Sequence, residues 1–364
     1  MEQLKIAITG DLSLTGIFEK KIRGNEEIFS DEIIAVLKSV DYCICNLEGA
    51  VTDFIKSSDS KTILSNPPNT INYLVKRNIK VFNLANNHIL DNGKHGLIDT
   101  LNELKGYSYF GAWLNDEKVN NSITIGNNIK VKLTSFTERI NDGDSNCLVS
   151  TKKDLNILGK YDCRWNIIFH HGGEEFTLYP SPTKRNLFKR IQIKNNPDFI
   201  ISHHSHTLQG FEKINNTNIF YSLGNFIFDI PSHKLYNHTN ESAILILTLF
   251  KNSYTFDLVP IYINHEKGIV ELGSTEILKR FKQISNFSDF KMKWRKDAYR
   301  TLIKRKIPVN SEILKKPLHK KNVFELFIDP QFYLKAFRII FDNNNRSIYW
   351  NSFIYKVFYK TKND

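Results

Sequence analysis

The chain has 364 residues, of which 41% are hydrophobic and 24% are charged, and this composition is typical of a globular protein. Its length suits one large α/β domain with an additional segment, or two ordinary domains. No run of about 18 apolar residues is present, so we expect no transmembrane helix. The N-terminal MEQLKIAITGD lacks the features of a signal peptide, and the four cysteines are too few for a disulfide framework. We therefore expect a cytoplasmic protein with reduced thiols.

The net charge of +12 is concentrated at the C-terminal end of the chain. Residues 276–364 hold 21 Lys and Arg against 8 Asp and Glu, whereas residues 1–275 hold 29 against 30. This contrast predicts a near-neutral body, which we place at 1–272, and a basic, aromatic-rich and mostly helical extension over 273–364.

Hydrophobic periodicity predicts alternating strands and helices through the body. In chain order, the expected elements are strand 4–10, helix 31–39 capped by Ser30 or Asp31, strand 40–49, a helix within 66–78 capped by Asn69, strand 79–88, helix 96–106, two strands joined by a turn at 127–128, strand 165–171, helix 183–195, strands 198–206 and 218–226, and an antiparallel pair 243–250 and 254–264. This alternation, with hairpins added late in the chain, predicts an α/β fold with mixed sheets.

Polar residues that can bind metal ions follow five of the apolar runs. They are Asp11, the pair Asn46 and Glu48, the triplet 86–88 (Asn-Asn-His), the pair His170 and His171, and the group His203, His204 and His206. Because ligands bind at the carboxyl ends of strands in open α/β sheets, we expect these side chains to meet in one crevice.

Carboxylate, amide and imidazole groups together are the donors of a two-metal hydrolytic centre, in which ions ~3.5–4 Å apart hold phosphoryl oxygens. We interpret His204 and His206 as lying on one side of an extended segment, roughly 7 Å apart, so that each serves a neighbouring ion. Glu48 is our choice for the bridging carboxylate. Taken alone, the Asn-Asn pair would indicate a turn and the HHSH run a solvated loop. Five isolated histidines are expected to have ordinary surface or packing roles: His95, His233, His238, His265 and His319.

Several motifs in this order resemble the bacterial CapA family of poly-γ-glutamate capsule biosynthesis, a branch of the calcineurin-like metallophosphoesterases. They are GD at 10–11, NLEG at 46–49, NLANNHILDNG at 83–93, HHGGEE at 170–175, SHHSHTLQG at 202–210 and YSLGNFIFD at 221–229. The resemblance extends over roughly 1–260. It implies a sandwich of two mixed sheets flanked by helices, and a phosphoesterase-like hydrolase that acts in the synthesis of capsule or another extracellular polymer, either poly-γ-glutamate or polysaccharide.

The resemblance also implies roles for individual residues and two divalent transition-metal ions, Mn, Fe or Zn. Asp11 and His206 would bind the first ion, Asn87, His170 and His204 the second, and Glu48 both. His88 would stabilise or protonate the leaving oxygen, oriented by Asp91. The residues expected to support these ligands or to contact substrate are Asn46, His171, Glu174, His203 and Asn225.

The sequence departs from the family pattern at three places. Ser13 stands where a histidine usually follows the first aspartate, His171 replaces a tryptophan, and the segment 202–206 lacks the usual glycine and proline. These differences bear on the identity and number of the metal ions more than on the existence of a site.

The basic extension leaves more than one interpretation open. Phe287, Phe290, Trp294, Ala298 and Leu302 recur at near-helical spacing, with Lys and Arg between them. In one interpretation, the extension packs on the body and its basic face is solvated. In the other, residues 276–364 bind at the inner face of the membrane, to an anionic membrane surface, a capsule-synthesis complex or a polymer-linked substrate. The charge also suits nucleic acid, but no recognised motif supports it. The alternative functions are therefore a non-catalytic metal-binding subunit of a membrane polymer-synthesis complex and, least favoured, a nucleic-acid phosphodiesterase.

Overall fold

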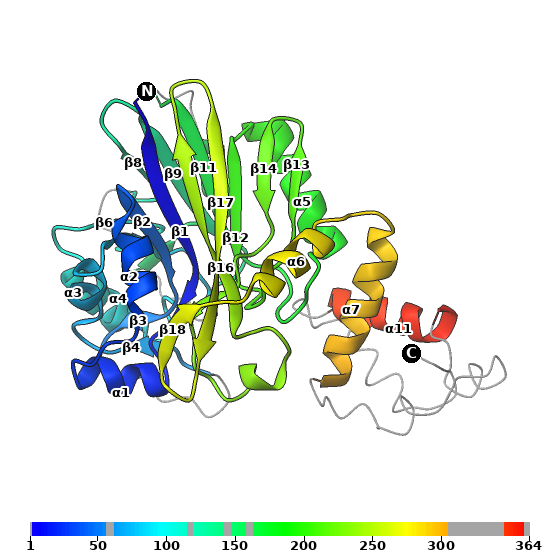
Figure 1. Cartoon of the computed structure of the whole chain (residues 1–364), viewed down its shortest axis with the longest axis horizontal. Coiled ribbons are helices and arrows are strands. Elements are labelled where there is room, and N and C mark those ends of the chain that lie inside the picture. Colours follow the sequence, from blue (N-terminus) through cyan, green and yellow to red (C-terminus); the bar gives the residue numbers. More distant parts are fainter. Residues whose placement is uncertain are drawn as a thin grey trace.

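A computed structural model describes residues 2–55, 62–114, 119–141, 147–157, 163–304 and 346–359. His319 and residues 305–345 of the basic extension lie outside the described residues. Two stacked β-sheets form the body, and the C-terminal helices lie to one side of it (Figure 1).

The larger sheet has the N-terminal strand in its middle and mixes parallel with antiparallel pairs. Its strands in spatial order are β18 (Ile269–Leu272), β17 (Tyr254–Asn264), β16 (Glu241–Leu249), β1 (Leu4–Leu12), β2 (Tyr42–Leu47), β5 (Ile79–Asn83) and β6 (Ser108–Phe110), and β15 (Asn225–Ile227) also pairs with β1. Strands β1, β2, β5 and β6 run parallel to one another. Strand β16 pairs antiparallel with β1, and β17 and β18 continue the antiparallel pairing. The expected closing pair is therefore confirmed as β16 and β17.

The smaller sheet supplies the second group of strand ends. Its order is β13 (Phe211–Ile214), β14 (Thr217–Phe220), β12 (Phe199–His203), β11 (Trp165–His171), β9 (Val131–Thr137) and β8 (Ser122–Ile125). The four inner strands are parallel, and the expected turn near 127–128 joins antiparallel β8 to β9. Two short pairs complete the strands: β3 (Ala50–Val51) with β4 (Ser65–Asn66), and β7 (Ala112–Leu114) with β10 (Cys147–Val149).

Side-chain alternation along the strands builds the layers. Ile6 and Ile8 of β1 meet Ile167 and Phe169 of β11 in the core between the sheets. The other face of the larger sheet packs against α1 (Ile17–Arg23), α2 (Asp31–Lys38), α3 (Thr70–Val75) and α4 (Gly93–Glu103), and the other face of the smaller sheet against α5 (Pro182–Asn195). The predicted mixed α/β sandwich flanked by helices is thereby confirmed. All four cysteines are free, and Cys43 and Cys45 share the helix-facing core.

One predicted helix cap is present in the structure, whereas two other predicted helices differ at their ends. Ser30 caps α2 by accepting a hydrogen bond from the backbone of Ile33, but Asn69 at the start of α3 is left-handed and its side chain makes no capping bond. The helix expected over 96–106 spans Gly93–Glu103, because residues 104–107 continue as a hydrogen-bonded turn in which Gly106 has a φ of 89°.

The basic extension begins with helices that are packed, not free. Ile277 and Phe281 of α6 (Thr275–Ile284) join the core between the sheets. In α7 (Phe290–Lys304), the predicted stripe of Phe290, Trp294, Ala298 and Leu302 is buried with Ile348 of α11 (Arg346–Phe358). Short 3₁₀ turns occupy Lys152–Ile157 and His233–Leu235. None of the described helices is long and apolar enough to cross a bilayer.

Candidate metal centre

The parallel register of β1, β2 and β15 aligns the first polar side chains. Asp11 lies opposite both Asn46 and Asn225 in the strand pairings. Asn46 Nδ2 donates a hydrogen bond to Asp11 Oδ1 at 2.9 Å, and Asn83 Nδ2 donates to Asn46 Oδ1 at 2.9 Å. The Asp11 carboxylate is therefore held in a fully buried position by a chain of amides.

Strand alternation separates His170 from His171, which point to opposite faces of β11. Both ring nitrogens of His170 have partners on the α5 side, Ser202 Oγ at 2.8 Å and Glu138 Oε1 at 3.0 Å. His171 faces the space between the sheets, where its Nε2 lies 2.7 Å from Asn87 Oδ1. This placement corrects the expectation for His170, since His171 is the imidazole that reaches the other candidate ligands.

The segment carrying His204 and His206 is a turn and not the extended strand that we expected. The strand β12 ends at His203, and His204 and His206 have left-handed φ values of 83° and 54°. The turn folds back on β1, because the backbone N–H of His204 donates to Asp11 Oδ2 at 3.0 Å. The two rings are consequently 5.9 Å apart between centroids.

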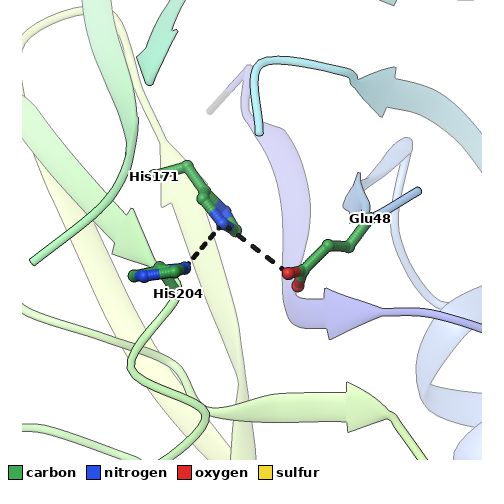
Figure 2. A group of neighbouring side chains, drawn as sticks. All are labelled: Glu48, His171 and His204. Carbon is green, nitrogen blue, oxygen red and sulfur yellow. Dashed lines mark hydrogen bonds and ion pairs between the residues drawn. The ribbon is translucent and has the colours of Figure 1, made fainter. Parts of the chain in front are cut away.

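Ligand-type atoms gather in three overlapping groups. One contains Glu175, His204 and His206, and the other two share the carboxylate of Glu48. Glu48 lies with His171 and His204 in one group and with Asp11 and His206 in the other, and the ligand atoms of each group are within 4.8 Å of one another. Figure 2 shows the group of Glu48, His171 and His204, in which His171 Nε2 is 3.1 Å from His204 Nδ1 and 3.7 Å from Glu48 Oε1. A shared carboxylate between two donor groups is an arrangement that can hold two neighbouring cations.

The electrostatics of these groups fit a divalent cation. Both Glu48 oxygens and His204 Nε2 are buried without a hydrogen-bond partner among the described residues. Burial, and then the charge of Asp11, raise the pKa of Glu48 well above its usual value. Burial also lowers the pKa of His171 and of His204 well below the usual value, which keeps their imidazoles neutral. Neutral imidazoles beside a buried carboxyl group without a hydrogen-bond partner suit a divalent transition-metal ion.

His88 is oriented at the edge of this centre. Its Nδ1 lies 2.6 Å from Asp91 Oδ2, and its Nε2 is 3.9 Å from Glu48 Oε1. The same Asp91 oxygen accepts a hydrogen bond from the backbone N–H of Leu64 at 3.0 Å. Asp91 thus fixes the ring so that Nε2 faces the ligand groups.

The remaining predicted residues support the centre in different ways. Asn225 Oδ1 lies 2.8 Å from His206 Nδ1, and buried His203 stacks on Phe169 with its Nδ1 3.5 Å from Asp11 Oδ1. Glu174 is buried, and burial raises its pKa against the opposing effects of the Ser181 hydrogen bond and the Lys184 charge. Glu174 therefore points into the protein.

A cavity of about 650 Å³ opens beside the ligand groups and includes residues that the sequence did not reveal. Asn87, His88 and His206 line it together with Arg139, Glu175, Phe176 and His233. His233 was expected to have an ordinary role, but its ring lies 4.4 Å from that of His206. Glu175 stands in the HHGGEE motif at 170–175, although no role was expected for it. No local pattern marked Arg139, Phe176 or His233, because they reach the cavity from separate segments of the chain.

The other isolated histidines within the described residues have ordinary partners away from the cavity. His238 Nδ1 pairs with Glu241 at 2.8 Å, His265 Nδ1 pairs with Asp229 at 3.1 Å, and the ring of His95 lies 5.2 Å from that of Phe54.

The family model and the curated relatives that match this chain agree on one family. The model of the family "Bacterial capsule synthesis protein PGA_cap" matches residues 5–230. The chain is 28% identical to the "PGA biosynthesis protein CapA" of Bacillus subtilis over 311 residues, which cover 78% of this chain and 79% of that protein. It is 29% identical to the "Capsule biosynthesis protein CapA" of Bacillus anthracis over 290 residues, covering 72% and 68% respectively.

Solved structures that match this chain include a phosphatase and a calcineurin-like phosphoesterase. One is a novel phosphatase from Mycoplasma pneumoniae, with 14% identity, a TM-score of 0.48 and coverage of 77% of this chain and 97% of that one. The other is the calcineurin-like phosphoesterase YfkN from Bacillus subtilis, with 12% identity, a TM-score of 0.42 and coverage of 78% and 97%.

Proposed function

The chain belongs to the bacterial capsule synthesis protein family PGA_cap, and from that membership we propose that it is a metal-dependent phosphoesterase-like hydrolase. We place its action in the synthesis of capsule or another extracellular polymer, poly-γ-glutamate or polysaccharide. The observation that carries the proposal is the fully buried Glu48, shared by two donor groups next to a cavity. A buried carboxylate is costly in its ionised form unless it has a partner, and a bound cation would supply that partner.

Two divalent ions, Mn, Fe or Zn, would be held by this chain's own donors. Asp11 and His206 would hold one ion and Asn87, His171 and His204 the other, with Glu48 between them. When bound, such ions neutralise phosphoryl oxygens and make water a stronger nucleophile.

The protein side chains around the ions orient the substrate and move protons. His88, held by Asp91, has its Nε2 3.9 Å from Glu48 Oε1, and from this position it would donate a proton to the oxygen that leaves the phosphoryl group. Arg139 Nη2 donates to the carbonyl of Gly173 at 2.9 Å, which fixes a positive charge at the wall of the cavity. This charge attracts an anionic substrate.

The substrate is proposed to be phosphorylated or polymer-linked. We further propose a cytoplasmic protein that associates peripherally with the inner face of the membrane, where the basic residues of 276–364 would favour an anionic surface or a capsule-synthesis complex. Because the aromatic stripe of α7 is buried, that contact would use other residues of the extension.

The adjacent histidines of β11 provide the sharpest test. Full-length His171→Ala should lose bound metal and phosphodiester hydrolysis, since its Nε2 lies among the candidate ligands. His170→Ala should keep its metal content and lose about 1–3 kcal/mol of stability, because Ser202 and Glu138 lose a buried partner. The measurements are elemental analysis after purification, hydrolysis of bis(p-nitrophenyl) phosphate with added Mn²⁺ or Zn²⁺, and urea unfolding.

Exposed His95, on α4, gives a histidine control, and His95→Ala should match the wild type in metal content and hydrolysis. Metal binding by the wild type without hydrolysis of any phosphoester in a broad panel would favour the non-catalytic subunit instead. A wild-type protein that binds no divalent metal would contradict both functions.

A further inference from the structure

Helix α7 of the basic extension holds the loop between β11 and α5. Asp297 Oδ2 accepts hydrogen bonds from the backbone N–H groups of Leu178 and Tyr179, at 2.6 and 3.0 Å. One turn further along, Thr301 Oγ1 donates to the carbonyl oxygen of Phe176 at 3.1 Å. The helix lies outside the residues that match the family model, yet it reaches a residue that lines the cavity.

Phe176 is held in a conformation that its own backbone does not favour. Its φ of 61° is left-handed, which is unfavourable for a bulky residue unless the surroundings impose it. The backbone N–H of Phe176 donates to the carbonyl of Ser205 at 2.8 Å, between the candidate ligands His204 and His206. Phe176 is therefore fixed between the metal-site turn on one side and Thr301 of α7 on the other.

The ring of Phe176 belongs to a continuous set of aromatic rings, which we call the aromatic wall: Phe176, Phe228, His233 and Tyr236. Ring centroids are 4.0 Å apart for Phe176 and Tyr236, 4.9 Å for Phe176 and His233, and 4.8 Å for Phe228 and His233. Phe228 also lies 4.7 Å from the ring of His206. The wall thus begins directly beside a candidate metal ligand.

The cavity lining includes an aromatic and apolar part and a polar part, among other residues. Phe176, Phe228 and His233 of the wall line it together with Ile230, whereas a polar part contains Asn87, His88, Arg139 and Asn141. Phosphoryl oxygens suit the polar part. A group attached to phosphorus through the leaving oxygen has the aromatic wall within reach, because the wall touches His206.

We infer that the aromatic wall is a subsite for a planar, apolar group esterified to the phosphoryl group, and that Asp297 and Thr301 are positioning residues that hold Phe176 in this wall. The inference rests on the proposed function and deepens it by naming an aryl phosphoester as the favoured class of substrate. Apolar lining around a few placed polar groups is the usual form of a small-molecule site.

Two non-hydrolysable probes separate this subsite from the metal centre. Phenylphosphonate and methylphosphonate carry the same anionic group, and only the first carries a planar ring. Calorimetry with the full-length, Mn²⁺-loaded protein should show at least about tenfold tighter binding of phenylphosphonate, because the ring is buried against the wall. Phe176→Ala should remove most of that ratio and leave the affinity for methylphosphonate close to that of the wild type.

The positioning residues are tested by the same ratio. Asp297→Ala and Thr301→Val each remove hydrogen bonds to the loop, so each should lower the ratio while methylphosphonate affinity is kept. Asp297→Asn retains an oxygen acceptor and should restore the ratio. Lys291→Ala, at an exposed position of α7, should match the wild type.

Each contrary outcome overturns a different part of the inference. Equal affinity for the two phosphonates, or an unchanged ratio in Phe176→Ala, overturns the subsite and leaves the proposed function standing. An unchanged ratio in both Asp297→Ala and Thr301→Val overturns the positioning role, as does parallel weakening of both probes. Binding of neither phosphonate to the wild type overturns the proposed function and the subsite with it.

Discussion

At the scale of single residues, His88 separates proton transfer from metal binding. Its Nδ1 is engaged by Asp91 at 2.6 Å, and its Nε2 stays 3.9 Å from the nearest Glu48 oxygen. A ring held in this way can serve the leaving oxygen without being a ligand.

We therefore predict that His88→Ala keeps the wild-type metal content and loses about 10²–10⁴-fold in kcat for alkyl phosphoesters, the usual contribution of a general acid. The loss should be much smaller for p-nitrophenyl esters, because their leaving group departs without a proton. Steady-state kinetics with both ester types and elemental analysis check this. Loss of metal from the variant would instead make His88 a ligand.

At the scale of elements, α7 carries a titratable contact with the body. Burial raises the pKa of Asp297 to about 7, although the Tyr179 and Leu178 N–H groups and the charge of Arg300 oppose the shift. An aspartate in an unfolded chain has a pKa of about 3.9. Between these two values the folded protein binds more protons than the unfolded chain, so stability falls as the pH rises.

The predicted result is a pH-dependent difference between the wild type and Asp297→Asn. As the pH rises from about 4 to about 7, the wild type should lose unfolding free energy relative to the variant, by up to about 1.4 kcal/mol per pH unit. Urea unfolding across this range measures the difference. Thr301→Val removes a nearby contact without an ionisable group, so its difference from the wild type should not vary with pH. A flat profile for Asp297→Asn would contradict the assignment.

At the scale of the whole molecule, the packing of α6 tests whether the body ends at residue 272, as expected from the sequence. Ile277 and Phe281 are almost fully buried in the core between the two sheets. A chain that ends at 272 therefore leaves apolar surface of both sheets open to water.

We predict that a chain of residues 1–272 is less stable than one of residues 1–288, by roughly 1.5–3 kcal/mol for each of the two buried side chains. Thermal and urea unfolding of both chains, with sedimentation to detect aggregation, give the comparison. The control is a 1–288 chain that carries Lys279→Ala at an exposed position of α6, and its stability should be close to that of the unchanged 1–288 chain. Equal stability of 1–272 and 1–288 would show that α6 contributes nothing to the body.

Local pattern alone accounts for the alternating elements and for the positions of the polar strand ends. Apolar periodicity marks a strand wherever it occurs, and ligand-type residues such as Asp11, Asn87 and His206 directly follow such runs. The α/β class with mixed sheets and the convergence of these strand ends follow from that pattern, because parallel strands bring their carboxyl ends to one edge. The two-sheet sandwich was expected from the resemblance to the CapA family.

Only the tertiary structure decided which neighbouring side chains face the centre. The choice of His171 over His170 depends on which face of β11 meets the other sheet, and the left-handed turn at His204 and His206 depends on a hydrogen bond to Asp11 from 193 residues away. Contacts between distant segments likewise place Arg139 and Phe176 at the cavity and bring Asp297 to the backbone of Leu178. Such contacts leave no periodic trace in the chain, since they are set by how the sheets and helices pack and not by the spacing of residues.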